Sequence, residues 1–86
     1  MATRYSVRLK DRAERELRKL PQKEIVRIVR RLRELALDPR PYGCQKLSGV
    51  ELYRIRQGDY RVLYTIYDDE HLVEIIKIGH RREVYR

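Results

Sequence analysis

The chain has 86 residues, with 21 lysines and arginines against 13 acidic side chains, a formal net charge of +8 at pH 7 and a pI near 10.0. This length can bury one modest core, so we expect a single small domain over residues 1–86. The lone Cys44 excludes an internal disulfide and a cysteine-based metal cluster. No apolar run has the length of a signal peptide or a membrane span, so we expect a cytoplasmic protein. The charge predicts a polyanionic partner, either nucleic acid or an acidic protein, rather than a membrane surface.

The first half of the chain predicts one strand and two helices. Residues 5–9 alternate apolar and polar side chains, as a short strand does. Asp11 can cap a helix that continues through Leu20, and Pro21 then breaks it. The second helix, over about residues 22–37, has an apolar stripe that we expect to pack on a sheet, formed by Ile25, Ile28, Val29, Leu32, Leu35 and Ala36.

The second half predicts a β-hairpin centred on Gly58-Asp59. Glycine at the first position of a two-residue loop suits a type II′ turn, which places Gln57 opposite Tyr60 and Arg56 opposite Arg61. Directly opposed residues share one face of a sheet, and faces alternate along a strand. One face therefore carries Tyr53, Ile55, Tyr60, Val62, Tyr64 and Ile66, and the other carries Arg54, Arg56 and Arg61.

A last strand over residues 71–78 follows a turn at residues 68–70. A three-residue loop there would place Tyr67 opposite His71 and Lys77 opposite Arg61. Residues 45–49 form a very short strand or only a connection. The element order is β-α-α-β-β-β, an α+β architecture with two helices packed on one face of a small, mostly antiparallel sheet. The arginine-bearing face is left uncovered, and the tail from Gly79 can fold back beside it.

This face has two interpretations. Like charges directly opposite each other destabilise a sheet, so Arg56 against Arg61 is a local cost of the kind found at functional sites. An anion-binding site explains that cost. A solvated outer face in a basic protein is the alternative.

Three segments resemble the RelE branch of the RelE/ParE toxin superfamily: YRIR at residues 53–56, GDYRVLY at 58–64 and IGHRREVY at 78–85. The resemblance extends over nearly the whole chain and implies a RelE-like fold. It implies the toxin of a type II toxin–antitoxin system, an endoribonuclease that cuts mRNA in the ribosomal A site without a metal or other cofactor. The implied partners are the ribosome, mRNA and a cognate antitoxin, through which the toxin–antitoxin complex binds operator DNA.

The resemblance also assigns site residues. Arg61 matches the arginine that stabilises the reacting phosphate, Arg81 the tail arginine that stabilises the transition state or protonates the leaving group, and Tyr85 the tail tyrosine that stacks on a base. Arg54 and Arg56 stand where well-known members carry lysines, and this chain departs from the pattern there. We predict Arg56 to be catalytic, and we expect RNA contacts from Arg54, Lys77, Arg82, Arg27 and Arg31.

Cleavage by this route needs a proton acceptor for the attacking 2′-OH and cations around the phosphorus. Arginine is effectively always protonated, so Arg54 and Arg56 are poor bases. We therefore hypothesise that His80 takes the proton, since an imidazole suits proton transfer near neutral pH. The alternative is a solvated histidine at a strand end. The acidic run Asp68-Asp69-Glu70 is more typical of a solvated turn than of a metal site.

Two other functions stay open. A ParE-like inhibitor of DNA gyrase would use protein contacts and have no nuclease site, and fold does not separate it from a nuclease. A basic binding module that has lost catalysis would bind ribosomes without cutting mRNA. Arg61, Arg81 and Tyr85 discriminate among these functions, because RNA chemistry gives each of them a role.

Overall fold

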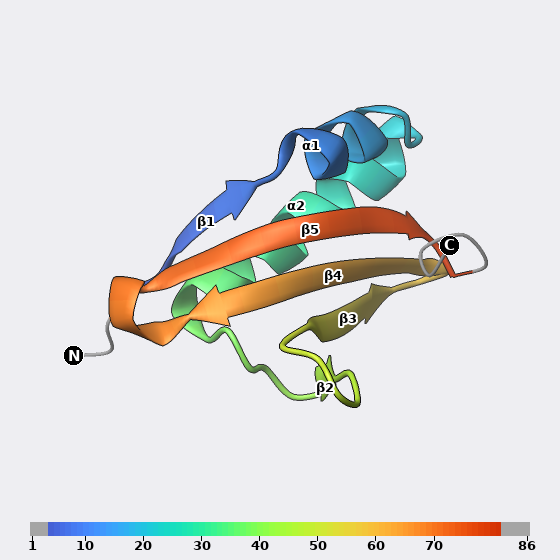
Figure 1. Ribbon diagram of the computed structural model, residues 1–86. Coiled ribbons are helices and arrows are strands. Elements are labelled where there is room, and N and C mark those ends of the chain that lie inside the picture. Colours follow the sequence, from blue (N-terminus) through green and yellow to red (C-terminus); the bar gives the residue numbers. More distant parts are fainter. Residues whose placement is uncertain (1–3, 82–86) are drawn as a thin grey trace.

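The computed structural model describes residues 4–81 (Figure 1). Two helices, α1 (Asp11–Arg18) and α2 (Gln22–Leu37), follow the first strand, β1 (Ser6–Leu9). The remaining strands are β2 (Gln45–Lys46), β3 (Tyr53–Gln57), β4 (Tyr60–Tyr67) and β5 (Leu72–His80), with a short 3-10 turn, Asp68–Glu70, between the last two. The predicted α+β order is confirmed, and the segment after Cys44 contains a two-residue strand rather than only a connection.

The five strands form one sheet in the order β1-β5-β4-β3-β2. β1 pairs with β5 in parallel, and the other three pairings are antiparallel, as expected for a mostly antiparallel sheet. β1 pairs with β5 only from Leu72 to Ile75. The part of β5 from Lys77 onward therefore has no strand on its outer side, and α1 lies above it (Figure 1).

Neither helix begins with a hydrogen bond from an N-cap side chain. Lys10, not Asp11, is the N-cap of α1 and makes no side-chain cap bond, so the prediction that Asp11 caps this helix is wrong. Asp11 instead contributes a carboxylate to the first turn, where the helix dipole favours negative charge. Pro21 is the N-cap of α2, and its carbonyl accepts hydrogen bonds from Glu24 and Ile25. The predicted bounds of α2 are confirmed.

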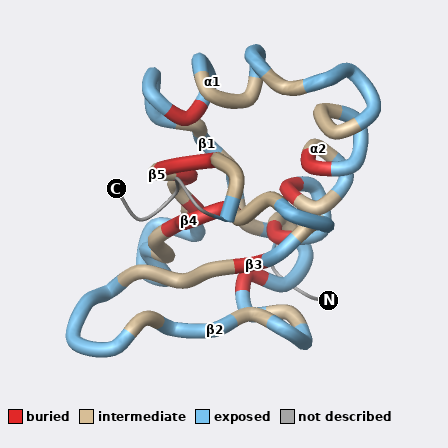
Figure 2. Tube along the Cα trace, turned by 90° about the vertical axis from the view of Figure 1, so that its right-hand side faces the viewer, coloured by how far each residue is buried: buried red, intermediate tan, exposed pale blue. Residues whose placement is uncertain are grey.

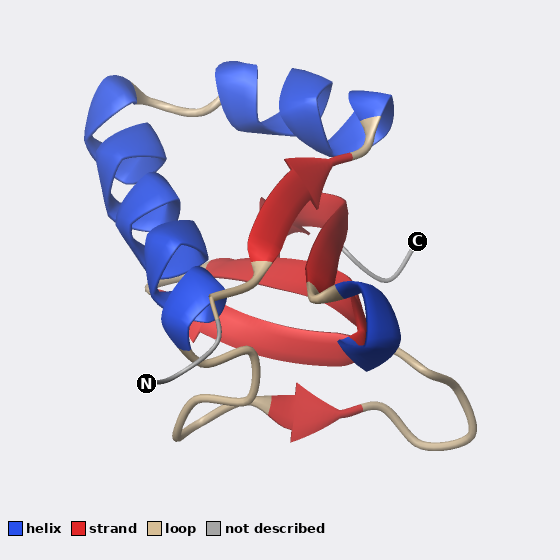
Figure 3. Cartoon of the chain, turned by 90° about the vertical axis from the view of Figure 1, so that its left-hand side faces the viewer, coloured by secondary structure: helices blue, strands red, loops and turns tan. Residues whose placement is uncertain are grey.

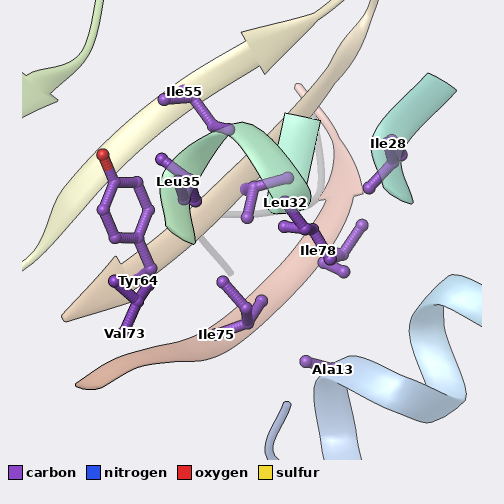
Figure 4. Packing of buried hydrophobic residues seen from close by; sticks show 10 residues of the cluster. Ala13, Ile28, Leu32, Leu35, Ile55, Tyr64, Val73, Ile75 and Ile78 are labelled. Atoms are coloured by element: carbon purple, nitrogen blue, oxygen red, sulfur yellow. The ribbon is translucent and has the colours of Figure 1, made fainter. Parts of the chain in front are cut away.

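The core lies between α2 and the sheet (Figure 4). The helices gather on one side of the sheet (Figure 3), and the buried segments of helices and strands face one another (Figure 2). The predicted stripe and hairpin face meet there as expected, although Ile25, Val29 and Ala36 are only half-buried. The core consists of Ala13, Ile28, Leu32, Leu35, Ile55, Val62, Tyr64, Val73, Ile75 and Ile78.

The predicted register of the β3–β4 hairpin is confirmed, with Arg56 opposite Arg61 and Gln57 opposite Tyr60. Gly58 has the positive φ, 60°, that the first position of a type II′ turn requires.

The predicted register of β4 with β5 is wrong. Tyr67 pairs with Leu72, because His71 extends the turn by one residue in the left-handed conformation, with φ of 50°. A register shift between Leu63 and Tyr64 adds a second offset, so Lys77 pairs with Leu63 and not with Arg61. One offset of a single residue would move the side chains of β5 to the opposite face of the sheet, and a second offset moves them back. Lys77 therefore still lies on the same face as Arg61. The strand also extends to His80, past its predicted end at residue 78.

Candidate functional site

The sheet face turned away from the helices carries two rows of side chains, which we call the arginine face. One row runs across the sheet from Arg54 through Leu63 to Lys77, and the next runs from Arg56 through Arg61 to Gly79. The arginine face is thus defined by Arg54, Arg56, Arg61, Leu63, Lys77 and Gly79. It brings together four of the predicted site residues from three strands.

Arg61 is at the centre of this face. Its Nε is shielded from solvent and has no hydrogen-bond partner in the part of the chain described, residues 4–81. A buried donor without an acceptor is costly, and directly opposite stands the like charge of Arg56. An anionic ligand would relieve both costs, because it supplies acceptors and negative charge at one place.

The neighbours of Arg61 on this face are a glycine, a buried lysine and an arginine held by β2. Gly79 pairs with Arg61 across β4 and β5 and places no side chain beside it. Lys77, on the same face, has only 8% of its surface exposed. Arg54 is held in place from β2, where Gln45 accepts a hydrogen bond from its guanidinium.

His80 lies on the other face. It pairs with Tyr60, and its ring meets the Tyr60 ring edge to face at 5.9 Å between centroids. Directly opposed residues share a face, so the imidazole is on the helix side of the sheet and Arg61 is not. The expectation that His80 lies among the arginines is wrong, because strand alternation at Gly79 turns it away.

The remaining predicted residues are spread over other parts of the chain. Arg81 follows β5, and its N–H donates to the carbonyl of Asp59 at 2.8 Å, which keeps its backbone beside the hairpin turn. Arg82 and Tyr85 lie outside the described residues. Arg27 and Arg31 are on α2, across the sheet from the arginine face, and form ion pairs with Glu24 at 3.1 Å and Glu34 at 3.5 Å.

Gly79 is a site residue that was not predicted from the sequence. The signal was a glycine inside an otherwise apolar strand, a position that often marks close approach of a ligand. Among residues 4–81, no group of three or more His, Cys, Asp or Glu side chains is arranged to hold a metal ion. In the same part of the chain, no helix is both long and apolar enough to cross a membrane.

The resolved pKa shifts lie away from the arginine face. Burial raises the pKa of Tyr64, whose hydroxyl donates to the carbonyl of Pro39 at 2.8 Å. Hydrogen bonds from Arg40 and Tyr5 lower the pKa of Asp68 to about 2. Both groups connect the loop after α2 to the sheet, so they stabilise the scaffold of the site.

Comparison with known proteins finds relatives over almost the whole chain. A family model described as the ParE toxin of type II toxin–antitoxin system, parDE, matches residues 7–85. Toxin RelG of Mycobacterium tuberculosis is 34% identical over 86 residues, which cover 95% of this chain and 97% of that protein. Toxin RelE of the same organism is 38% identical over 84 residues, covering 95% and 87%.

Solved structures give the same result. The toxin–antitoxin complex RelBE2 from Mycobacterium tuberculosis contains a chain with a TM-score of 0.83 and 29% identity, covering 96% of this chain and 98% of that one. The archaeal RelE–RelB complex from Pyrococcus horikoshii OT3 gives a TM-score of 0.82 and 29% identity, covering 98% and 100%.

Proposed function

The chain belongs to the RelE/ParE superfamily of type II toxin–antitoxin toxins, and from that premise we propose that it is a ribosome-dependent endoribonuclease that cuts mRNA in the A site. The observation that carries the proposal is the arginine face, where Arg56 opposes Arg61 beside the bare backbone of Gly79. A pair of opposed cations next to a position without a side chain suits a phosphodiester.

The proposed reaction is attack of a ribose 2′-oxygen on the adjacent phosphorus. A bond forms between these two atoms, the bond from phosphorus to the 5′-oxygen breaks, and the products are a 2′,3′-cyclic phosphate and a 5′-hydroxyl. Arg61 and Arg56 would bind the phosphate oxygens as negative charge accumulates on them, with Arg54 holding the neighbouring RNA backbone. Arg81 would stabilise or protonate the departing 5′-oxygen, and Tyr85 would stack on a base.

We assign the proton acceptor to Lys77 rather than to His80. Lys77 is a nitrogen base on the arginine face, whereas His80 faces the helix layer. Arginine cannot take this role because it is effectively always protonated, while lysine is a residue type that serves as a general base. Lys77 is also largely shielded from solvent, at 8% exposure.

The proposed protein partner is a cognate antitoxin, as in the RelBE2 and Pyrococcus complexes. A groove of apolar side chains runs between the two helices and β1, lined by Val7, Leu9, Leu17, Val29, Leu32 and Ala36 and edged by Arg33. Val26 and Leu37 of α2 extend the apolar surface, at 50% and 59% exposure. An amphipathic antitoxin segment with acidic flanks would fit this groove, so Val26→Glu should weaken antitoxin binding more than the apolar change Val26→Leu at the same position.

We further propose that α2 contacts ribosomal RNA through Arg27, which is exposed, and Arg31, which is half-buried. Arg27 and Arg31 would then hold phosphates, and ribosome affinity should fall steeply with salt. Because the proposed targets are the ribosome and mRNA, we infer a cytoplasmic location. Binding of the toxin–antitoxin complex to operator DNA would occur through the antitoxin.

The test is cleavage of mRNA on programmed ribosomes, mapped by primer extension, with wild type against Arg61→Ala. We expect A-site cuts that require the ribosome and that fall about 10²- to 10³-fold in the variant. Arg8→Ala is the matched control, since Arg8 is an exposed strand arginine that pairs with Glu74 on the sheet. If the wild-type protein cuts no mRNA on ribosomes, the proposed nuclease function is rejected.

The second candidate is a gyrase inhibitor of the ParE type, favoured by the family model that matches residues 7–85. Inhibition of DNA supercoiling by the purified protein, unchanged in Arg61→Ala, would support it. The arginine face has no evident role in such an inhibitor.

A further inference from the structure

A second cavity adjoins the arginine face, at the edge of the sheet. A groove of about 430 Å³ lies between the last turn of α1 and the end of β5, and its lining includes Glu16, Lys19, Tyr60, Lys77, Gly79 and His80. This is the part of β5 that β1 does not reach, with α1 above it (Figure 1). Gly79 lines the groove and also lies opposite Arg61 on the arginine face, so the two sites adjoin at this residue.

Glu16 gives this groove a chemistry different from that of the arginine face. Its Oε1 accepts a hydrogen bond from the backbone N–H of Ile78 at 3.0 Å, and its Oε2 accepts one from Arg12 at 3.4 Å. These contacts fix the carboxylate at the unpaired edge of β5. An ionised carboxylate is acceptor-only and can take further donors. This carboxylate attracts N–H groups, so it can recognise the edge of a base that presents donors.

The other lining residues complete a site for a base. Tyr60 and His80 present two aromatic rings at an interplanar angle of 83°, and unstacked RNA bases bind proteins through such rings. Lys19 adds an ammonium donor from α1. The volume lies within the range of about 300–1,000 Å³ that is typical of small-ligand pockets.

We propose that this groove is a nucleobase subsite that takes guanine from the RNA bound at the arginine face; this inference rests on the proposed nuclease function. Guanine has two adjacent donors, N1–H and the N2 amino group, which match a carboxylate, and an O6 acceptor that matches the ammonium of Lys19. Adenine, cytosine and uracil each lack that pair of adjacent donors. The groove would therefore select the sequence that is cut, while the arginine face holds the phosphate.

The test compares Glu16→Gln with Glu14→Gln in the full chain. Glutamine keeps a carbonyl oxygen for the Ile78 N–H but replaces one acceptor by a donor. Glu14 is the matched control because it also forms an (i, i+4) ion pair on α1, with Arg18, and does not line the groove. Titrations with guanosine and adenosine 5′-monophosphate, followed by amide chemical shifts, report the base, because both probes carry the same phosphate.

We expect guanosine monophosphate to shift the amides of Tyr60, Ile78 and His80 and to bind more tightly than adenosine monophosphate. Glu16→Gln should lower its affinity about tenfold and Glu14→Gln should not change it. In the ribosome assay, Glu16→Gln should lose a preference for guanine beside the cut. Equal binding of the two nucleotides, or equal affinity in wild type and Glu16→Gln, would overturn the subsite.

The two proposals fail in different ways. Guanosine monophosphate binding that Glu16→Gln weakens, in a protein that cuts no mRNA, keeps the subsite and rejects the nuclease. Cutting on ribosomes without selective binding of guanosine monophosphate keeps the nuclease and rejects the subsite.

Discussion

Arg56 lies directly opposite Arg61 in the β3–β4 hairpin, so two positively charged side chains are paired across the strands. Opposed like charges destabilise a sheet by about 0.2–1 kcal/mol. The Arg61 Nε is shielded from solvent and has no hydrogen-bond partner among the described residues. The hairpin therefore carries a cost that a bound anion would remove.

The first prediction is that Arg56→Gln trades activity for stability. Removing one of the two opposed charges should raise the free energy of unfolding by about 0.2–1 kcal/mol. Loss of a phosphate contact should lower the rate of mRNA cleavage by about 10²-fold or more. Urea unfolding and the ribosome assay measure the two effects. Arg8→Gln is the control, because it removes a charge that is paired with Glu74 and should not stabilise the protein. A destabilised Arg56→Gln would contradict this account of the hairpin.

The sequence was sufficient to predict this hairpin because local rules determine it. A glycine at the turn and the alternation of faces set the register of Arg56 and Arg61 without reference to the rest of the chain. The register of β5 could not be found in this way. It depends on the left-handed His71 and on an offset near Tyr64, and neither has a sequence signal comparable to Gly58-Asp59.

The difference between a register set by local rules and one set elsewhere in the chain also explains which site positions were predicted correctly. Arginines placed by the hairpin are together as predicted, whereas His80 depended on the exact register and length of β5. Once the strand continues to His80, alternation puts Gly79 on the arginine face and the imidazole on the other. The groove at Glu16 arises from the packing of α1 on β5, a long-range contact that no local pattern of residues indicates.

The second prediction separates the two candidate bases. Lys77→Arg keeps the positive charge but removes the proposed proton acceptor, so RNA affinity should be retained while the cleavage rate falls about 10²- to 10⁴-fold. His80→Gln should preserve the shape of the pH–rate profile, because His80 faces the helix layer. Single-turnover cleavage on ribosomes across a range of pH measures both. An active Lys77→Arg together with a flattened profile in His80→Gln would return the role to His80.

The third prediction concerns the anchor of the loop after α2. The Tyr64 side chain is fully buried, and its hydroxyl is the donor that satisfies the buried carbonyl of Pro39 at 2.8 Å. Tyr64→Phe keeps the ring but leaves that carbonyl unsatisfied, so we expect a loss of about 1–3 kcal/mol in the free energy of unfolding. Tyr42→Phe is the control, because Tyr42 is fully exposed and its hydroxyl is in water. Equal stability of the two variants would show that the Pro39 carbonyl finds another donor.

The last prediction concerns a polar cluster that joins three distant segments. Asp68, in the β4–β5 turn, accepts hydrogen bonds from Arg40 at 3.2 and 2.9 Å and from the Tyr5 hydroxyl at 2.6 Å. The bonds from Arg40, and then that from Tyr5, lower the pKa of Asp68 to about 2. A carboxyl whose folded pKa is lowered stabilises the fold above its unfolded pKa, and that contribution is lost as the pH falls towards the folded value.

Asp68→Asn should therefore be less stable than wild type at pH 7, and the difference should shrink between about pH 4 and pH 2 as the wild-type carboxyl takes up its proton. Urea unfolding at several pH values measures the difference. Asp69→Asn changes the neighbouring carboxyl in the same turn and should give no such pH-dependent difference. A gap between Asp68→Asn and wild type that stays constant down to pH 2 would mean that the carboxylate charge contributes nothing. The cluster would then hold β1, the loop after α2 and the β4–β5 turn together by neutral hydrogen bonds alone.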